Sequence, residues 1–152
     1  MNRDFVEMLS ELFAANVDFI VVGAHALAAH GVPRATGDLD IWVRPSPDNA
    51  QRVLEALGRF GAPLFDLTVA DLCRSDTVFQ IGQPPARIDI LSGISGVDFD
   101  EAWAKRMTVS IGGLDVALLS RDDFIANKRA AGRAKDLADL ALLEEDDQRD
   151  RS

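Results

Sequence analysis

The stretch Asp38-Leu39-Asp40-Ile41-Trp42-Val43 decides how this chain is interpreted. It predicts a β-strand in which alternate residues share a face, so the apolar residues at 39, 41 and 43 point into the core. Asp38 and Asp40 then lie side by side on the opposite face, where their like charges repel unless a cation or basic groups neutralise them. Oxygen ligands at this spacing suit Mg²⁺ or Mn²⁺, which take one or two carboxylates together with phosphate and water. The alternative is a solvated strand end with two acids of no functional role.

A second predicted strand carries a third acid. The run Arg87-Ile88-Asp89-Ile90-Leu91 places Asp89 on the same face as Arg87, between two apolar residues. If the two strands are neighbours, Asp89 joins Asp38 and Asp40 in a cluster of three carboxylates. Such a cluster can hold two divalent ions and promote an in-line phosphoryl displacement. The alternative is a surface ion pair between Arg87 and Asp89 that needs no function.

A glycine precedes the acidic pair at the end of another predicted strand. In Val22-Gly23-Ala24-His25 the strand turns into a helix, and a glycine at such a turn lets backbone N–H groups approach a phosphate. The loop that follows carries Arg34 and Thr36, where an arginine can neutralise phosphate or acids. An ordinary turn and an ordinary surface loop are the alternatives. His25 is expected beside the site, and His30 is expected to be structural.

Length and composition favour one soluble domain. The 152 residues are 47% hydrophobic and 27% charged, which is enough for a single core, and no repeat or linker divides them. The single cysteine, Cys73, favours a reducing, cytoplasmic setting. The apolar stretch 19–32 is too short to cross a membrane, so no membrane partner is expected. The net charge of −9 argues against broad, nonspecific affinity for nucleic acid.

The order of the predicted elements gives the fold class. Helices are predicted over 4–15, 23–31, 46–57, 68–74, 99–105, 120–131 and 135–143, and strands over 19–22, 39–43, 77–81 and 87–91, with a hairpin around Gly112-Gly113. Because strands and helices do not strictly alternate, we expect an α+β fold, a mixed β-sheet flanked by helices in a single domain. That domain is expected to span 1–143, and the segment 144–152, which has no apolar residue, is expected to be an acidic flexible tail.

Three segments in this order resemble the nucleotidyltransferase superfamily with the DNA polymerase β-like fold. They are Gly23-Ala24-His25-Ala26, residues 31–40 and Arg87-Ile88-Asp89. The run over 120–140 is similar to the ending of small bacterial members related to abortive-infection, toxin-type nucleotidyltransferases. The resemblance implies a metal-dependent enzyme that moves a nucleoside monophosphate from an NTP to a hydroxyl, and it implies the toxin part of a toxin–antitoxin pair.

The resemblance also implies roles for individual residues. Asp38 and Asp40 would bind the metal that holds the triphosphate, and Asp89 would complete the metal site and help to deprotonate the acceptor hydroxyl. Lys128 would reach the phosphates as a point charge. Where many members have serine after the first glycine, this chain has Ala24, so the backbone N–H carries the contact. The nucleotide-binding residues are expected to be Gly23, Ala24, Arg34, Thr36 and Lys128.

The acceptor and the partners stay open at this point. The acceptor hydroxyl could belong to RNA such as tRNA, to a protein or to a small molecule, and a cognate antitoxin protein is an expected partner. Two other classes of function are an inactive module of this fold that acts through a partner and a metal-dependent nuclease. The glycine turn upstream of the acidic pair favours transfer, because a nuclease does not need to bind a triphosphate.

Overall fold

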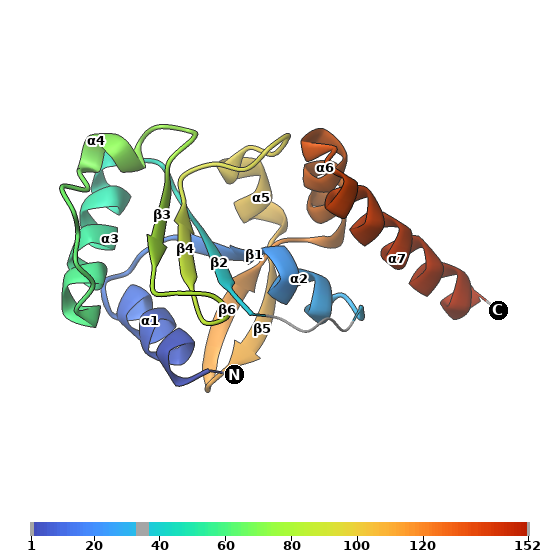
Figure 1. Cartoon of the computed structure of the whole chain (residues 1–152), viewed down its shortest axis with the longest axis horizontal. Coiled ribbons are helices and arrows are strands. Elements are labelled where there is room, and N and C mark those ends of the chain that lie inside the picture. The colour runs from blue at the N-terminus through green and yellow to red at the C-terminus, as the bar shows by residue number, and fades with distance from the viewer. Residues whose placement is uncertain (1, 33–36, 152) are drawn as a thin grey trace.

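A mixed sheet of six strands forms the centre of the molecule (Figure 1). The structure is a computed structural model that describes residues 2–32 and 37–151. The strands are β1 (Phe19–Val22), β2 (Leu39–Val43), β3 (Val78–Ile81), β4 (Ile88–Leu91), β5 (Met107–Ile111) and β6 (Leu114–Leu118). Across the sheet they follow the order β3-β4-β2-β1-β6-β5, with parallel and antiparallel pairs.

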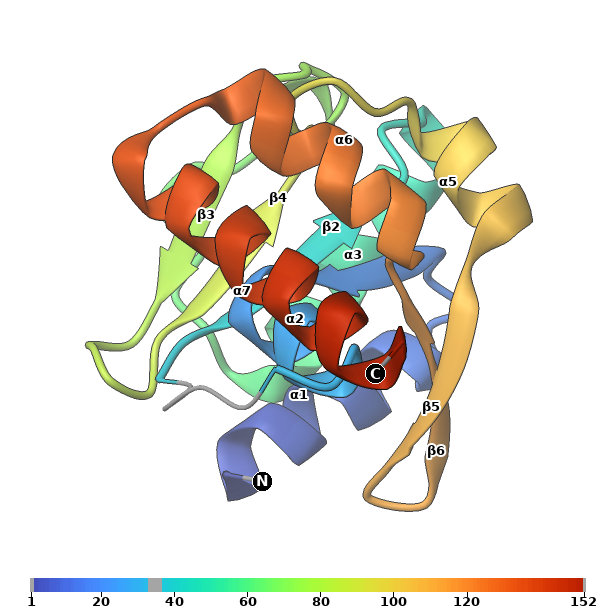
Figure 2. The ribbon, with the colours of Figure 1, turned by 90° about the vertical axis from the view of Figure 1, so that its right-hand side faces the viewer.

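Helices cover both faces of this sheet. They are α1 (Arg3–Ala14), α2 (Gly23–Ala29), α3 (Pro47–Phe60), α4 (Val69–Leu72), α5 (Phe99–Lys105), α6 (Arg121–Ala131) and α7 (Ala134–Arg151). Helices α1 and α3 pack together on one side, whereas α2, α5 and α6 lie on the other (Figures 1 and 2). The expected α+β fold, a mixed sheet flanked by helices in one domain, is confirmed. None of the helices in 2–32 and 37–151 has the length and apolar character needed to span a membrane.

The two central strands place the acidic residues. All four residues of β1 are buried, which is typical of an apolar run in the middle of a sheet. Strand β2 runs antiparallel to β1, and its Leu39 and Ile41 are fully buried, as the alternation predicts. Trp42 is also buried, because α5 covers that end of the opposite face through Phe99. The acidic end of β2 therefore projects from a rigid, well-packed strand.

Two capping residues fix the helix that faces this acidic end. The Ser120 hydroxyl accepts a hydrogen bond from the Asp123 backbone N–H at 3.2 Å, so α6 begins where the sequence predicts. Gly132 ends it with a left-handed backbone, φ +64°. The chain then reverses into α7, which packs on α6 and extends away from the body (Figure 1).

The last helix is longer than the sequence predicts. It continues beyond Leu143 to Arg151, through the segment 144–151 that was expected to be a tail. That segment contains no glycine or proline, and its Glu, Gln and Arg residues favour helix, so nothing in it ends α7.

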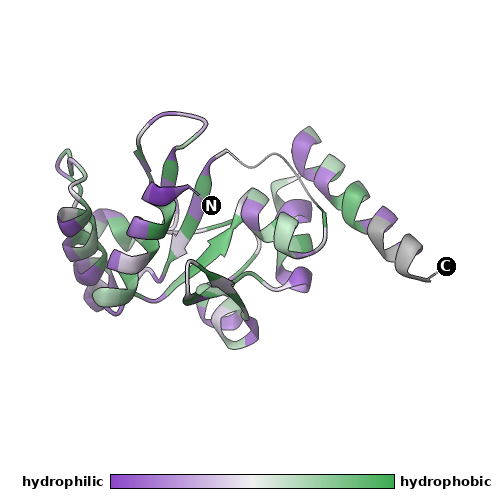
Figure 3. Cartoon of the chain, turned by 90° about the horizontal axis from the view of Figure 1, so that it is seen from below, coloured by the Kyte–Doolittle hydropathy of each residue, from purple (hydrophilic) through white to green (hydrophobic). Residues whose placement is uncertain are grey.

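Elsewhere the molecule follows the expected pattern, with hydrophobic residues concentrated in the strands and polar residues on the outer helix faces (Figure 3).

Candidate active site

Asp40 and Asp89 lie opposite each other in the centre of the sheet. Strands β2 and β4 pair in parallel, and the register matches Asp40 to Asp89. The two strands that carry the acids are therefore neighbours, which is the condition under which the sequence predicts an acidic cluster. Asp89 is only 7% exposed, and Asp40 is half-buried beside it.

This arrangement concentrates negative charge. Burial, the charge of Asp89, a hydrogen bond with Asp89 and the charge of Asp38 together raise the pKa of Asp40 to about 6, and burial is the largest of these causes. The raised pKa means that the site disfavours the ionised carboxylate, because it is buried and because two other carboxylates lie nearby. The pair is thus a place where a bound cation would be stabilised.

Arg87 supplies part of the missing positive charge. Its Nε donates to Asp89 Oδ1 at 2.8 Å, and its Nη2 lies 3.2 Å from Asp38 Oδ2. The Arg87 backbone N–H also donates to Asp38 Oδ1 at 3.1 Å. The ion pair between Arg87 and Asp89 is present, but it is largely enclosed, because the Asp89 side chain is 11% exposed.

The three acids consequently do not converge on one point. Arg87 holds both Asp38 and Asp89, and Asp89 also faces Asp40 across the strand pair. Across 2–32 and 37–151, no group of three or more acidic, histidine or cysteine side chains is arranged to hold a metal ion. Two carboxylates are still enough for Mg²⁺, which takes one or two of them and fills its other positions with water and substrate phosphate. The donor chemistry of Asp40 and Asp89 therefore fits a divalent cation whose remaining ligands come from a nucleotide.

Gly23 packs directly against this pair. It has a left-handed backbone with φ +71°, and a Cβ atom at this position would overlap Asp40 Oδ2. The glycine is therefore needed for the acid of β2 as well as for the turn into α2. Gly23 and Ala24 line a cleft of about 290 Å³ that opens over Asp40 and Asp89. The backbone at the start of α2 thus faces the space where a phosphate could lie.

Lys128 reaches the same cleft from α6, but it does so as a buried ion pair. Its side chain is 11% exposed, and Nζ lies 3.2 Å from Asp136 Oδ1 and 3.6 Å from Asp139 Oδ2. Asp136 is fully buried and also accepts from Arg133 Nε at 2.7 Å. Burial opposes ionisation of Asp136, yet hydrogen bonds from Arg133 and Lys128 lower its pKa to about 2. The charge of Lys128 is thus already balanced by α7.

Lys135 is a further basic residue of this cleft. It stands at the start of α7, is exposed, and lines the cleft with Asp40 and Asp89. Its charge also lowers the pKa of Asp40, although this effect is smaller than the burial that raises it. The sequence leaves open whether Lys135 contacts phosphate. Its signal in the sequence is the basic run that begins at Lys128 and continues past the end of α6.

The remaining expected residues divide into two groups. Arg34 and Thr36 lie outside the described residues. His25 was expected beside the site, but its ring packs edge-on against Phe5 of α1, with centroids 5.8 Å apart, and it does not line the cleft. His30 is structural as expected, because its Nε2 lies 2.8 Å from the Leu119 carbonyl oxygen.

Comparisons with known proteins identify the family of the chain. The family model described as a nucleotidyltransferase of unknown function (DUF6036) matches residues 3–144. A Thermotoga maritima protein provisionally assigned as a nucleotidyltransferase is similar in structure over 95% of this chain and 94% of its own, with a TM-score of 0.54 and 15% identity. An antigenic nucleotidyltransferase-like protein from Paracoccidioides brasiliensis matches 92% of this chain and 72% of its own, with a TM-score of 0.47 and 15% identity.

Comparison with curated proteins gave no match. The likeness to the Thermotoga maritima structure shows that the two proteins share a fold. The family model spans nearly the whole chain, including both acidic strands and the glycine turn. On these grounds the chain belongs to the nucleotidyltransferases, in the family of unknown function that this model describes.

Proposed function

We propose that this chain is a metal-dependent nucleotidyltransferase that moves a nucleoside monophosphate from an NTP to a hydroxyl. The observation that carries the proposal is the register of β2 and β4, which sets Asp40 against Asp89 at the floor of a cleft. The rim of that cleft carries Gly23, Lys128 and Lys135, so a triphosphate would meet backbone N–H groups and positive charge there.

Asp40 and Asp89 are the residues that would hold Mg²⁺ or Mn²⁺, and Asp38, which lines the same cleft, would join them once Arg87 releases it. Bound there, the cation would neutralise triphosphate charge and make the acceptor hydroxyl more acidic. Arg87 holds two of these acids in the present structure, so it has to share or release them when a cation binds. A released guanidinium would lie at the edge of the cleft, where it can pair with phosphate oxygens.

The chain's own groups would act mainly by positioning and charge. Lys135 and the start of α2 orient the triphosphate, and Lys128, whose charge Asp136 already balances, holds the wall of the cleft in place. The acceptor oxygen attacks the α-phosphorus while the bond from that phosphorus to the bridging oxygen breaks. Pyrophosphate leaves with the bonding electrons, and the hydroxyl proton passes to the carboxylate of Asp89.

One observation favours a second candidate, an inactive binding module. Arg87 pairs with both Asp38 and Asp89 and so competes with a cation for these acids, as expected for a module that has no need of one. Such a module would act through a protein partner, for which a cognate antitoxin in the cytoplasm is our proposal. Either candidate binds nucleotide in the same cleft, so turnover is what separates them.

The test uses each of the four NTPs, labelled on the α-phosphate, with Mg²⁺ and a cell extract as the source of acceptors. If the chain is a transferase, pyrophosphate is released and the label appears in one fraction of the extract. That fraction contains the small molecules, the RNA or the protein. Nucleotide-dependent stabilisation without pyrophosphate release identifies the binding module. Cleavage of added RNA without NTP consumption identifies a nuclease and contradicts the proposal.

A further inference from the structure

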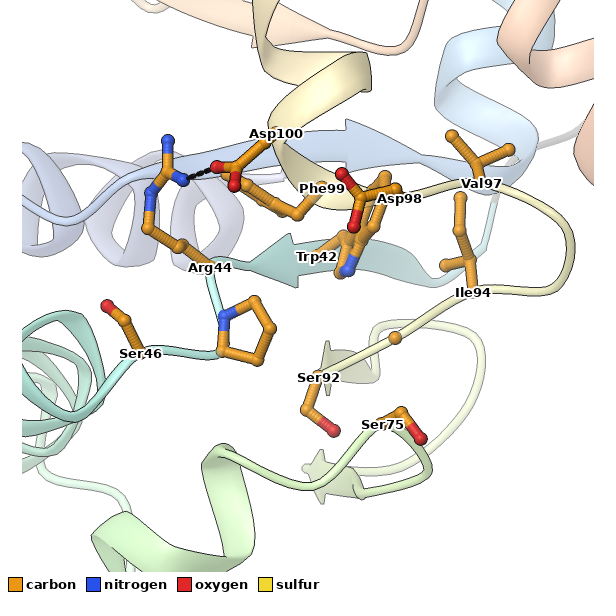
Figure 4. A pocket seen from close by; sticks show the side chains of 12 residues that line it. Trp42, Arg44, Ser46, Ser75, Ser92, Ile94, Val97, Asp98, Phe99 and Asp100 are labelled. Carbon is orange, nitrogen blue, oxygen red and sulfur yellow. Dashed lines mark hydrogen bonds and ion pairs between the residues drawn. The ribbon is translucent and has the colours of Figure 1, made fainter.

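A separate cavity of about 280 Å³ lies at the other end of β2 (Figure 4). Its walls come from four places in the chain. Trp42 and Arg44 stand at the end of β2, Asp98 and Phe99 at the start of α5, and Ser75 and the loop after β4 close the opposite side. Of the residues expected from the sequence to bind metal or nucleotide, none that the structure describes lines this cavity.

Trp42 has an unsatisfied hydrogen-bond donor in this cavity. The residue is 2% exposed, and its ring packs edge-on against Phe99 with centroids 5.0 Å apart. Within the described part of the chain, the indole Nε1 has no hydrogen-bond partner. The edge that carries this nitrogen is turned towards the open space between Arg44 and Ser92 (Figure 4). Buried donors are almost always paired, so this N–H marks where an acceptor atom of a ligand fits.

The lining has excess negative charge. Arg44 Nε lies 2.9 Å from Asp18 Oδ2, and its Nη1 pairs with Asp100, so the guanidinium is already balanced. Asp98 accepts a hydrogen bond from the Glu101 backbone N–H at 3.3 Å, and among the described residues no basic side chain pairs with it. An anionic ligand would be repelled by Asp98, whereas an uncharged or cationic ligand could donate a hydrogen bond to it.

The cavity shares part of its rim with the groove that contains the acidic pair. A larger groove of about 680 Å³ is lined by Asp40 and Asp89 and shares Ser75, Gly93 and Ile94 with the cavity of Trp42. Trp42 also follows Asp40 by two residues on the same face of β2, a separation of about 7 Å along a strand. A small molecule held by Trp42 could therefore place a hydroxyl near Asp89.

We propose that this cavity is the acceptor subsite and that it takes a small, uncharged or cationic molecule that carries hydroxyl groups. An oxygen of this molecule accepts from Trp42 Nε1–H, and a neighbouring O–H or N–H donates to Asp98. A phosphate-bearing acceptor such as RNA is disfavoured by the same carboxylate. The term acceptor rests on the proposed function, whereas binding in the cavity does not.

The chain contains two tryptophans, so a ¹⁵N-labelled sample gives two indole N–H resonances. Trp103→Phe assigns the remaining resonance to Trp42.

The probes are three molecules of similar size, 2-amino-1,3-propanediol, glycerol and glycerate. We expect the first two to move the Trp42 resonance with saturation and to leave Trp103 nearly unmoved, and glycerate to bind about fivefold more weakly than the cation. No movement with any probe, or tighter binding of glycerate than of 2-amino-1,3-propanediol, overturns the proposal.

Asp98→Asn is the matched variant. Asparagine also caps helices, so α5 keeps its first hydrogen bond while the cavity loses one charge. We expect the preference for the cationic probe over glycerate to disappear in this variant and to persist in Asp48→Asn, an exposed acid of α3. An unchanged preference in Asp98→Asn contradicts the assigned charge selection.

The outcomes also separate this inference from the proposed function. If the Trp42 resonance responds and no NTP is consumed, the cavity is a ligand site and the transferase proposal fails. In another outcome NTP is consumed, the label goes to RNA or protein, and the Trp42 resonance does not respond. The assignment of the acceptor subsite is then wrong, and the transferase proposal is supported. Where both hold, Trp42→Phe should raise the KM for the acceptor severalfold and leave the NTP-dependent thermal shift unchanged.

Discussion

The carboxylate of Asp40 occupies the space that a side chain on Gly23 would need. A Cβ atom added to Gly23 would overlap Asp40 Oδ2, and the Gly23 backbone already has φ +71°. The glycine turn before α2 and the acid of β2 are therefore one packed unit, formed across the antiparallel β1–β2 pair. This contact fixes the position of an acid that would otherwise be free to turn away from Asp89.

Gly23→Ala should lower the free energy of unfolding by more than the backbone strain alone. A left-handed alanine costs about 1–2 kcal/mol, and the overlap with Asp40 adds a steric cost of about 1–3 kcal/mol. Denaturant unfolding measures the sum. Gly61→Ala is the control, because Gly61 also has a positive φ, +91°, with no atom within 4 Å of the added Cβ.

The contact itself is tested by a double-mutant cycle. In an Asp40→Ala background the overlap is gone, so Gly23→Ala should cost no more than Gly61→Ala does. Equal costs of Gly23→Ala with and without the Asp40 carboxylate would mean that the glycine serves the turn alone.

Asp40 should make the ligand-free protein less stable as the pH rises. Its folded-state pKa is about 6 and therefore above the ordinary value of 3.8, so folding favours the protonated form. The resulting stability is fully present below pH 3.8 and is lost as the pH rises through 6, by at most about 3 kcal/mol. Asp40→Asn should flatten this part of the curve and raise the stability at pH 7 to 8, as measured by urea unfolding between pH 4 and 8. A steeper loss of stability in the variant would contradict the assignment.

Lys128 should matter for stability even without nucleotide. Removing its ammonium leaves the fully buried Asp136 with Arg133 as its principal partner, at a cost of about 1–3 kcal/mol. Lys128→Met keeps most of the side-chain volume and isolates the charge. Lys105→Met is the control, since Lys105 is 60% exposed and lies 3.6 Å from Asp123, and it should cost less than about 1 kcal/mol. Equal melting temperatures of Lys128→Met and the wild type would show that the ion pair contributes nothing.

Arg87 should compete with divalent cations. Its guanidinium bonds to Asp38 and Asp89, so Arg87→Gln should bind Mn²⁺ roughly threefold or more tightly in the absence of nucleotide. Titration followed by the electron paramagnetic resonance of free Mn²⁺ measures this. Arg74→Gln is the control, because Arg74 is 68% exposed and lies 3.8 Å from Asp76. Weaker Mn²⁺ binding in Arg87→Gln would show that the arginine supports the metal site.

The sequence was most informative about local pattern. The alternation around Asp40 and Asp89 predicted both strands and the face that each acid shares, because side-chain direction in a strand depends only on position. The caps at Ser120 and Gly132 were equally local, so the bounds of α6 were predicted closely.

Contacts between distant elements could not be predicted in the same way. The burial of Lys128 depends on how α7 packs on α6, and a surface lysine and a paired one have the same local sequence. The cavity at Trp42 needs the end of β2, Ser75 and the start of α5 to meet, and nothing in those separate segments indicates it. The helical continuation to Arg151 does not follow from the sequence, because a segment without apolar residues predicts a tail and yet can also form an exposed helix.

The most direct test of the central claim is the rate of Mg²⁺-dependent pyrophosphate release in wild type, Asp89→Asn and Asp48→Asn. If Asp40 and Asp89 form the reacting site, Asp89→Asn should lose roughly 100-fold or more of the rate, as expected for a group that acts on the transition state. The exposed Asp48→Asn should retain the wild-type rate. Equal rates in Asp89→Asn and the wild type, with both proteins folded, would contradict the account.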